Sequence, residues 1–344
     1  MLDFDLFDPA EMTGFVRALQ FPDNGLEPWF PHRDRQDIEY AYAKANKRRE
    51  QMARYRGFDV PAPLGDRPGV EQVRGAIPPL SKKLPITEWE RLNLQRAQGN
   101  TQAAAMLEQL AYDDAQLLTE SLQARIEFAR GTVIQTGQVT FVTDEGFVGV
   151  AIDYGTVTAV TVPNVWSNYT LGKPLTDVRN ATNAYVTRNK GRKPGVLLTT
   201  TTVRSHMLLT DELRNYSGVG ATVPSILTPA QMGLIFDAHE LPPIVTYDAQ
   251  VNVPGVGDTP VLPANKAYLL PAPGDDRFAE TTYGVTAEAL ELVGKGFLTI
   301  ATAPGLVGVG MTEFDPVTKW TKVSGLAVPV CKDTDLITAL TVTA

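Results

Sequence analysis

The sequence predicts an α+β chain with one dominant helix and two protrusions. Apolar residues recur at spacings of three and four, and neither proline nor glycine interrupts the chain from Thr101 to Arg130. Residues 57–86 are so rich in proline and glycine that they disfavour a helix or a central strand. The C-terminal third is dominated by threonine, valine, isoleucine and leucine, which favour strands.

The dominant helix is amphipathic. At about 1.5 Å per residue it would be roughly 40 Å long. Thr101 is expected as its N-cap, and Gly137 as the turn residue after its last turn. The apolar stripe consists of Leu107, Ala111, Ala115, Leu118, Leu122, Ile126, Ala129 and Val133. The opposite face, which we expect to meet solvent or a neighbour, carries Glu108, Asp113, Glu120, Gln123 and Arg130.

Two irregular segments precede this helix. Residues 1–36 hold isolated aromatic anchors among Asp, Pro and Gly, which suits an arm laid across another surface. Residues 37–56 predict a short solvated helix, with an electrostatic contact to a neighbouring subunit or to nucleic acid as the alternative. Residues 57–86 predict an extended hairpin with 65–69 near its tip, and loops of this length are usually functional or disordered. The basic residues of the 37–56 segment are Lys44, Lys47, Arg48, Arg49, Arg54 and Arg56.

After the dominant helix, strands alternate with shorter helices. A hairpin is expected over Gln138–Ile152, and proline near the first turn supports helices at Pro174–Arg188 and at Thr228–Ala238, where Thr228 is the N-cap. A buried strand is expected at Val196–Thr200. Further strands are expected at 156–162, 244–253, 266–270, 297–309 and 322–342.

Composition excludes several classes of protein. A net charge of −8 disfavours a dedicated nucleic-acid binder, although a weakly acidic wall suits a container in which DNA slides. The single cysteine, Cys331, cannot form an intrachain disulfide, which fits a reducing cytosol or a fold that needs no disulfides. No apolar run reaches 18 residues, and the first nine residues lack the basic region of a signal peptide, so we expect no membrane segment.

The sequence offers little for catalysis or metal binding. It contains three histidines, and none has the spacing of a zinc site. His32 lies near acidic residues but also near two arginines, and Ser205 followed by His206 does not define a triad. Gly305, Gly308 and Gly310 imitate a dinucleotide turn with the wrong spacing. We therefore expect no catalytic residue, no metal and no cofactor, while a cytosolic hydrolase with an unrecognised site stays open as an alternative.

Ordered landmarks between residues 57 and 344 resemble one protein family. Residues 57–87 resemble that family's extended loop and its return. The C-terminal end of the dominant helix resembles the end of its long spine helix, and the C-terminal residues resemble its closing strands. Together they resemble the lambda-type major capsid proteins of tailed phages, the phage major capsid protein E family. The helix-end positions are Arg125, Glu127, Thr136 and Gly137. The other landmarks are Gly191–Thr200, Tyr247, Val261–Pro263, Lys266–Leu270, Asp315–Pro316 and Ala327–Leu340.

This resemblance implies the Hong Kong 97-type capsid fold. It implies an N-terminal arm, an extended loop hairpin, a spine helix, a peripheral domain and an axial domain. The expected divisions are 1–56 for the arm with a short helix, 57–86 for the extended loop, 87–154 for the peripheral domain with the spine helix, 155–310 for the axial domain, and 311–344 for C-terminal strands returning to the peripheral domain.

The resemblance also implies a function without catalysis. Such subunits form pentamers and hexamers of an icosahedral shell, assembled in the bacterial host cytoplasm, that encloses double-stranded DNA without sequence specificity. A portal and a scaffold are implied partners, and a decoration protein is left open. An encapsulin-like nanocompartment with a cargo-peptide pocket is the alternative. The expected contacts between subunits are Arg67, Arg74, Lys82 and Lys83.

Overall fold

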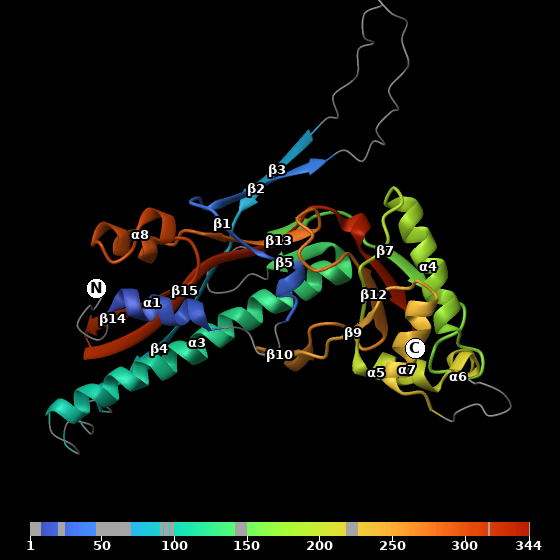
Figure 1. Cartoon of the computed structure of the whole chain (residues 1–344). Helices are drawn as coiled ribbons and strands as arrows, with labels where there is room; N and C mark the ends of the chain where they lie inside the picture. The colour runs from blue at the N-terminus through green and yellow to red at the C-terminus, as the bar shows by residue number, and fades with distance from the viewer. Residues whose placement is uncertain are drawn as a thin grey trace, which may run out of the picture.

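The long helix crosses the molecule from one end to its centre (Figure 1). It is α3, Asn100–Thr136, and from Ala111 to Val133 the predicted stripe is buried. The expected N-cap is wrong, because Asn100 is already helical and Thr101 lies inside the helix. The computed structural model describes residues 8–19, 25–45, 70–89, 92, 96, 100–141, 150–217, 226–315 and 317–343.

The first sheet packs against α3 through its longest strand, β15 (Val317–Cys331). Strand β15 pairs with β13 along its C-terminal part and lies between β14 and β4 along its N-terminal part. Pro79 and Pro85 lie in β4, an edge strand, where a missing N–H breaks no ladder on the open side. The other members are β1 (His32–Asp34), β4 (Pro79–Ile86), β13 (Ala279–Gly284) and β14 (Val307–Phe314).

The second sheet lies at the C-terminal end of α3, and helices surround it (Figure 1). Its strand order is β7 (Thr158–Thr161), β16 (Thr338–Thr341), β12 (Lys266–Leu270), β8 (Val196–Thr199) and β9 (Ile244–Thr246), with parallel pairs at both edges. The helices are α4 (Pro174–Arg188), α5 (Thr201–Leu209), α6 (Asp211–Ser217) and α7 (Pro229–Ala238).

Local sequence signals account for the ends of these helices. Helix α4 has the predicted bounds, with proline in its first turn. The predicted N-cap of α7 is confirmed, because the Thr228 side chain accepts from the Gln231 amide and the Gln231 side chain bonds back. The predicted strands at 196–200 and 266–270 are confirmed as β8 and β12.

Three hairpins stand beside the sheets. The predicted hairpin over 138–152 is confirmed, with its tip outside the described residues. The hairpin of β2 and β3 projects from the upper side of the body (Figure 1). The strand pairs are β2 (Glu39–Ala45) with β3 (Val70–Ala76), β5 (Gln138–Phe141) with β6 (Val150–Asp153), and β10 (Gln250–Val253) with β11 (Gly257–Pro260).

The β2–β3 pairing corrects the expectations for residues 37–86. Glu39–Ala45 is a strand and not part of a solvated helix, so the hairpin begins before residue 57. Tyr40 and Tyr42, two positions apart, are both buried at the base of the hairpin, and Tyr42 packs against Tyr154 at 6.2 Å between ring centroids. Burial of these aromatic rings at a period of two favours a strand over a helix. The expected tip at 65–69 lies outside the described residues.

The C-terminal third also departs from expectation. Only the end of the expected 297–309 strand is extended, because β14 begins at Val307 and Thr299 caps a short turn before it. Strand β13, before residue 310, pairs with β15 of the first sheet, whereas β16, after residue 310, belongs to the second sheet. The expected boundary at residue 310 therefore does not separate the strands of the two sheets. The remaining elements are α8 (Ala287–Gly294), η2 (Glu27–Trp29), η3 (Ile300–Thr302) and η4 (Thr334–Leu336).

The described part of the N-terminal arm packs on its own subunit. Helix α1 (Pro9–Ala18) buries Met12 and Val16 against the first sheet. Further along, Leu26 and Phe30 are fully buried, and the Trp29 indole donates to the Pro271 carbonyl at 3.0 Å. This segment is therefore part of the core instead of an arm over another surface.

We expect Gly137→Ala to destabilise the subunit by about 1–3 kcal/mol, because a left-handed residue at a helix end resists a side chain. Gly137 has φ +74°, and an added Cβ would lie 2.1 Å from the Gly155 carbonyl oxygen. Denaturant unfolding measures the effect. As a control, Gly233→Ala in α7 meets no atom within 4 Å, so it should be neutral or stabilising. Equal stability of both variants would contradict the prediction.

Candidate subunit interface

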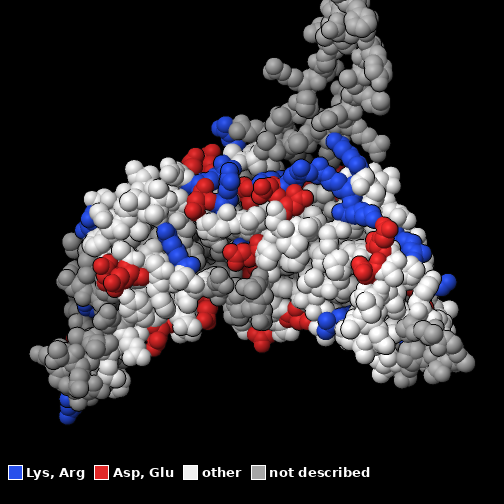
Figure 2. Space-filling model, in the orientation of Figure 1, with Lys and Arg blue, Asp and Glu red and all other residues white. Residues whose placement is uncertain are grey.

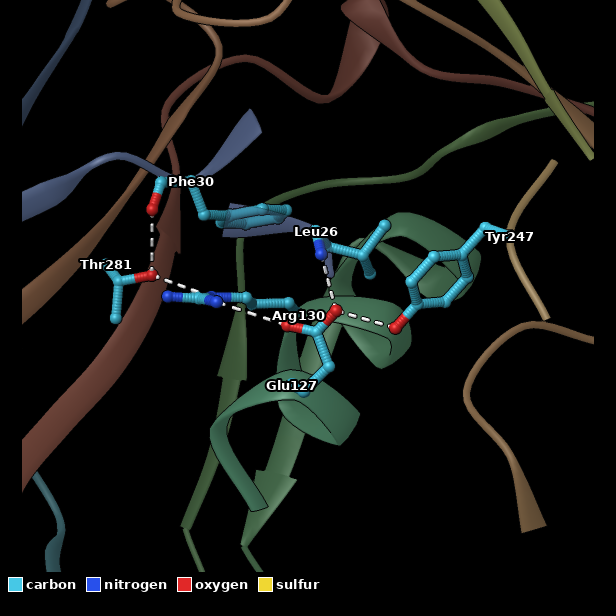
Figure 3. A network of polar contacts seen from close by, with 6 residues as sticks. All are labelled: Leu26, Phe30, Glu127, Arg130, Tyr247 and Thr281. Carbon is cyan, nitrogen blue, oxygen red and sulfur yellow. Dashed lines mark hydrogen bonds and ion pairs between the residues drawn. The ribbon is translucent and has the colours of Figure 1, made fainter. Parts of the chain in front are cut away.

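A buried polar network surrounds Glu127 on α3 (Figure 3). Glu127 Oε1 accepts from the Leu26 amide at 2.5 Å and from the Tyr247 hydroxyl at 2.6 Å. Glu127 Oε2 lies 3.1 Å from Arg130 Nη1, one turn along the helix. Glu127 is fully buried and Arg130 is 6% exposed. A buried carboxylate needs such partners, because removing an unpaired charge from water is costly.

Arg130 carries the network into the first sheet. Its Nε donates to Thr281 Oγ1 at 3.0 Å, and that hydroxyl donates to the Phe30 carbonyl at 3.2 Å. The expectation that Arg130 lies on a solvent-facing side of the helix is therefore wrong. Burial on the C-terminal half of α3 extends beyond the predicted stripe, since the first sheet, β5, β10 and the segment around Leu26 contact the helix.

The network joins segments that are distant in sequence. Leu26 belongs to the arm, Thr281 to β13, and Tyr247 to the connection between β9 and β10. Burial, followed by the neighbouring Glu127 carboxylate, raises the pKa of Tyr247 well above its usual value, so its hydroxyl remains a donor. Gly25 has φ +32°, and an added Cβ would lie 2.3 Å from Glu127 Oε1. The arm can therefore approach the carboxylate only through a glycine.

The end of α3 is fixed by two other predicted landmark residues, Thr136 and Gly137. Thr136 Oγ1 donates to the Thr132 carbonyl at 2.8 Å and accepts from the Gln138 amide at 3.2 Å, which links the helix to β5. Gly137 supplies the left-handed turn. Arg125 is only half-buried, and it does not share in the drawn network. Three of the four landmark positions thus have structural roles that hold the helix and its exit in place.

The described residues expected to contact other subunits lie on the hairpin and on the edge strand. Arg74 is exposed on β3, and Arg67 lies outside the described residues. Lys82 Nζ donates to Ser121 Oγ at 3.0 Å, and Lys83 Nζ lies 3.9 Å from the Trp320 ring centroid. Both lysines are exposed despite these contacts within the subunit.

A mixed-charge region surrounds the base of the hairpin. Arg35 and Arg74 line an open cavity of about 570 Å³ together with acidic residues that include Asp34 and Glu39. Figure 2 shows Lys and Arg side chains in a band along the upper edge of one face, interleaved with Asp and Glu. Opposite charges this close partly neutralise one another, so the band is no uniform phosphate-binding surface.

The described residues contain little that suggests catalysis. They hold no cluster of three or more His, Cys, Asp or Glu side chains able to bind a metal. His206 lies 3.2 Å from the Tyr169 hydroxyl, and His239 Nδ1 lies 2.9 Å from Arg179 Nη2. Among the helices of the described part of the chain, none is long and apolar enough to cross a membrane.

A family profile described as phage major capsid protein E matches residues 8–342. The chain belongs to the phage major capsid protein E family. The match spans both sheets, the spine helix α3 and the described part of the arm. Membership makes this chain a major capsid protein of the bacteriophage type.

Solved structures agree with this membership at the level of the fold. A candidate capsid protein from a prophage of Escherichia coli CFT073 has a TM-score of 0.64 and 12% identity, with 98% of this chain and 99% of that chain covered. A phage-related protein from Bordetella bronchiseptica RB50 has a TM-score of 0.53 and 13% identity, with 99% and 97% covered. The expected Hong Kong 97-type capsid fold is confirmed. No curated protein sequence matches the chain significantly.

Sequence reasoning missed two parts of the capsid protein's central network, Arg130 and Gly25. An acidic and a basic residue three positions apart on one helix are a possible ion pair, and this signal was present for Glu127 and Arg130. Gly25 carried no comparable signal, since its role depends on a carboxylate about a hundred residues away.

We expect Glu127→Gln to destabilise the subunit by about 3–5 kcal/mol, because the change leaves the Arg130 charge buried without its counter-ion. Chemical denaturation of the purified subunit measures the loss. Glu240→Gln is the control, since the Glu240 pair with Lys193 is exposed and its removal should have little effect. A Glu127→Gln subunit as stable as the control would show that the buried pair is not needed.

Proposed function

We propose that this capsid protein assembles through pentamers and hexamers into a closed icosahedral shell that encloses double-stranded DNA of a tailed phage. The family match carries the proposal. The shell would form in the bacterial host cytoplasm, with a portal and a scaffold as partners and without catalysis by the subunit. Many weak contacts repeated by symmetry are sufficient to make such a shell stable.

We propose that the two sheets belong to two different domains of the capsid subunit. The first sheet and the spine helix α3 would form the peripheral domain, and the second sheet with α4–α7 would form the axial domain around each capsomer axis. The central network joins the two parts, because Glu127 on α3 accepts from Tyr247 of the second part. A shell needs subunits of one shape, and a buried, fully hydrogen-bonded network favours one arrangement.

The β2–β3 hairpin is the proposed arm between subunits. Its base packs in the core through Tyr40 and Tyr42, while Arg74 on β3 is exposed. Proline and glycine are frequent in residues 57–69, which connect to β3, and restricted backbone angles at proline reduce the entropy lost on docking. We propose Arg67 and Arg74 of the hairpin, together with Lys82 and Lys83 of the edge strand β4, as contacts with a neighbouring copy.

Electron microscopy of the protein, expressed alone and with its neighbouring genes, tests the proposed function. Closed shells, tubes or capsomer rings are the expected result. DNA inside the shells would support a phage head, whereas a protein cargo would indicate an encapsulin-like nanocompartment. A monodisperse monomer under every condition would overturn the proposal.

We expect the double variant Arg67→Glu, Arg74→Glu to reduce shell formation without changing subunit stability. Charge reversal at contacts between subunits opposes association, whereas exposed charges contribute little to folding. Sedimentation measures assembly, and thermal unfolding of the subunit measures stability. The matched control is Arg67→Lys, Arg74→Lys, which keeps both charges. Normal shells from the double Glu variant would show that these two residues are not contacts.

A further inference from the structure

Helix α8 and the turn η3 form a small lobe on the first sheet. Ala289 and Leu292 of α8 are fully buried, in an apolar cluster that includes Val307 of β14. Glu288 Oε1 accepts from Lys322 Nζ of β15 at 2.5 Å, in a partly buried ion pair. Apolar packing and an ion pair together hold α8 against the sheet in one orientation, so its outer face is preorganised for a contact.

The outer face of α8 is apolar and exposed. Leu290 is 60% exposed, and Ala287 and Gly294 are also exposed. At about 100° per residue these three positions fall within about 60° of one another on the helix. A Cβ added at Gly294 would meet no atom within 4 Å. Ile300 of η3, in the same lobe, is 64% exposed. A leucine between two small residues lets a second helix approach closely, so this face is a small docking surface.

The charges beside this face indicate its partner. Glu291 and Lys295 are exposed, lie one helical turn apart and flank Leu290 on the same side. In an antiparallel pair of α8 helices related by a twofold axis, Glu291 of each copy faces Lys295 of the other. Such an isologous contact makes two ion pairs around an apolar centre. The face is therefore complementary to a second copy of itself.

The position of α8 indicates where the second copy belongs. Helix α8 lies at the end of the molecule opposite α4–α7 (Figure 1). With α4–α7 around the capsomer axis, as in the proposed function, α8 lies at the outer edge of the capsomer. A copy that meets α8 there belongs to a neighbouring capsomer.

We propose that two α8 helices, from copies in neighbouring capsomers, pack antiparallel through their outer faces about a twofold axis. The inference rests on the proposed function and adds one contact between capsomers. The face offered by one short helix is small, so the contact is weak between two free subunits. Repetition by symmetry makes it significant in a closed shell.

The first test places a charge in the contact of the full-length protein. We expect Leu290→Asp to reduce the yield of closed shells at least tenfold while capsomer rings still form, because the charge would be buried between the helices. Electron microscopy measures both assemblies, and thermal unfolding checks the subunit. Leu290→Met is the matched control, since it keeps an apolar side chain of similar volume. Equal shell yields from the two variants would overturn the inference.

The second test exchanges the charges. Glu291→Lys and Lys295→Glu each bring like charges together across the twofold axis, so each should reduce shell yield severalfold. Both changes in one chain restore opposite charges, and shell yield should return to near that of the unmodified protein. A double variant that assembles no better than the single variants would contradict the antiparallel pairing.

The third test detects the pairing by disulfide formation in assembled shells. The two ion pairs place the twofold axis midway between residues 291 and 295. At about 1.5 Å per residue, the two copies of residue 294 are then about 3 Å apart along the helices, and those of residue 287 about 18 Å. Oxidation should link Gly294→Cys subunits into dimers and leave Ala287→Cys subunits unlinked. The native Cys331 is buried.

The cysteine pair also decides the inference if Leu290→Asp unfolds the subunit. Dimers from both cysteine variants, or from neither, would overturn the antiparallel pairing. If the unmodified protein forms no shells, the proposed function fails. If it forms shells and Gly294→Cys gives no dimers in them, only this inference fails.

Discussion

The buried contact between Glu127 and Arg130 constrains the rest of the subunit. A carboxylate and a guanidinium removed from water need every available hydrogen bond, and here those bonds come from four separate segments. The Leu26 amide, the Tyr247 hydroxyl and Thr281 must each lie in one position. A buried polar network of this kind contributes uniqueness of shape more than free energy. In a shell built from many copies, uniqueness of shape is the property that matters.

Strand β15 provides the second constraint, since one continuous strand contributes to two parts of the first sheet. It pairs with β14 and β4 near its start and with β13 near its end. Movement of β15 would therefore shift three things together: β13, which contacts β2 of the hairpin, the edge strand β4, and the packing against α3. The first sheet and α3 should therefore respond to assembly forces as one body.

Local sequence signals predicted much of this fold, and distant pairings were beyond them. Proline and threonine at helix starts gave the bounds of α4 and the cap of α7, because those interactions span a few residues. Pairing of β2 with β3 was missed, since its partners are separated by a long connection. Burial of Arg130 was missed because a prediction from one apolar stripe takes only one face of the helix to be buried. The C-terminal half of α3 is instead enclosed on several sides. Of the candidate contacts, Arg67 lies outside the described residues.

The position of β16 has a consequence for synthesis of the protein. Strand β16 pairs with β7 on one side and β12 on the other, so residues 338–341 complete a sheet whose other strands lie between residues 158 and 270. Until those residues leave the ribosome, β7 and β12 have unpaired edges, and the second part of the molecule cannot close. Domains usually fold in order from the N-terminus during synthesis, but the second sheet cannot be completed until residues 338–341 are available. A chain that stops before residue 338 would therefore lack an interior strand of the second sheet.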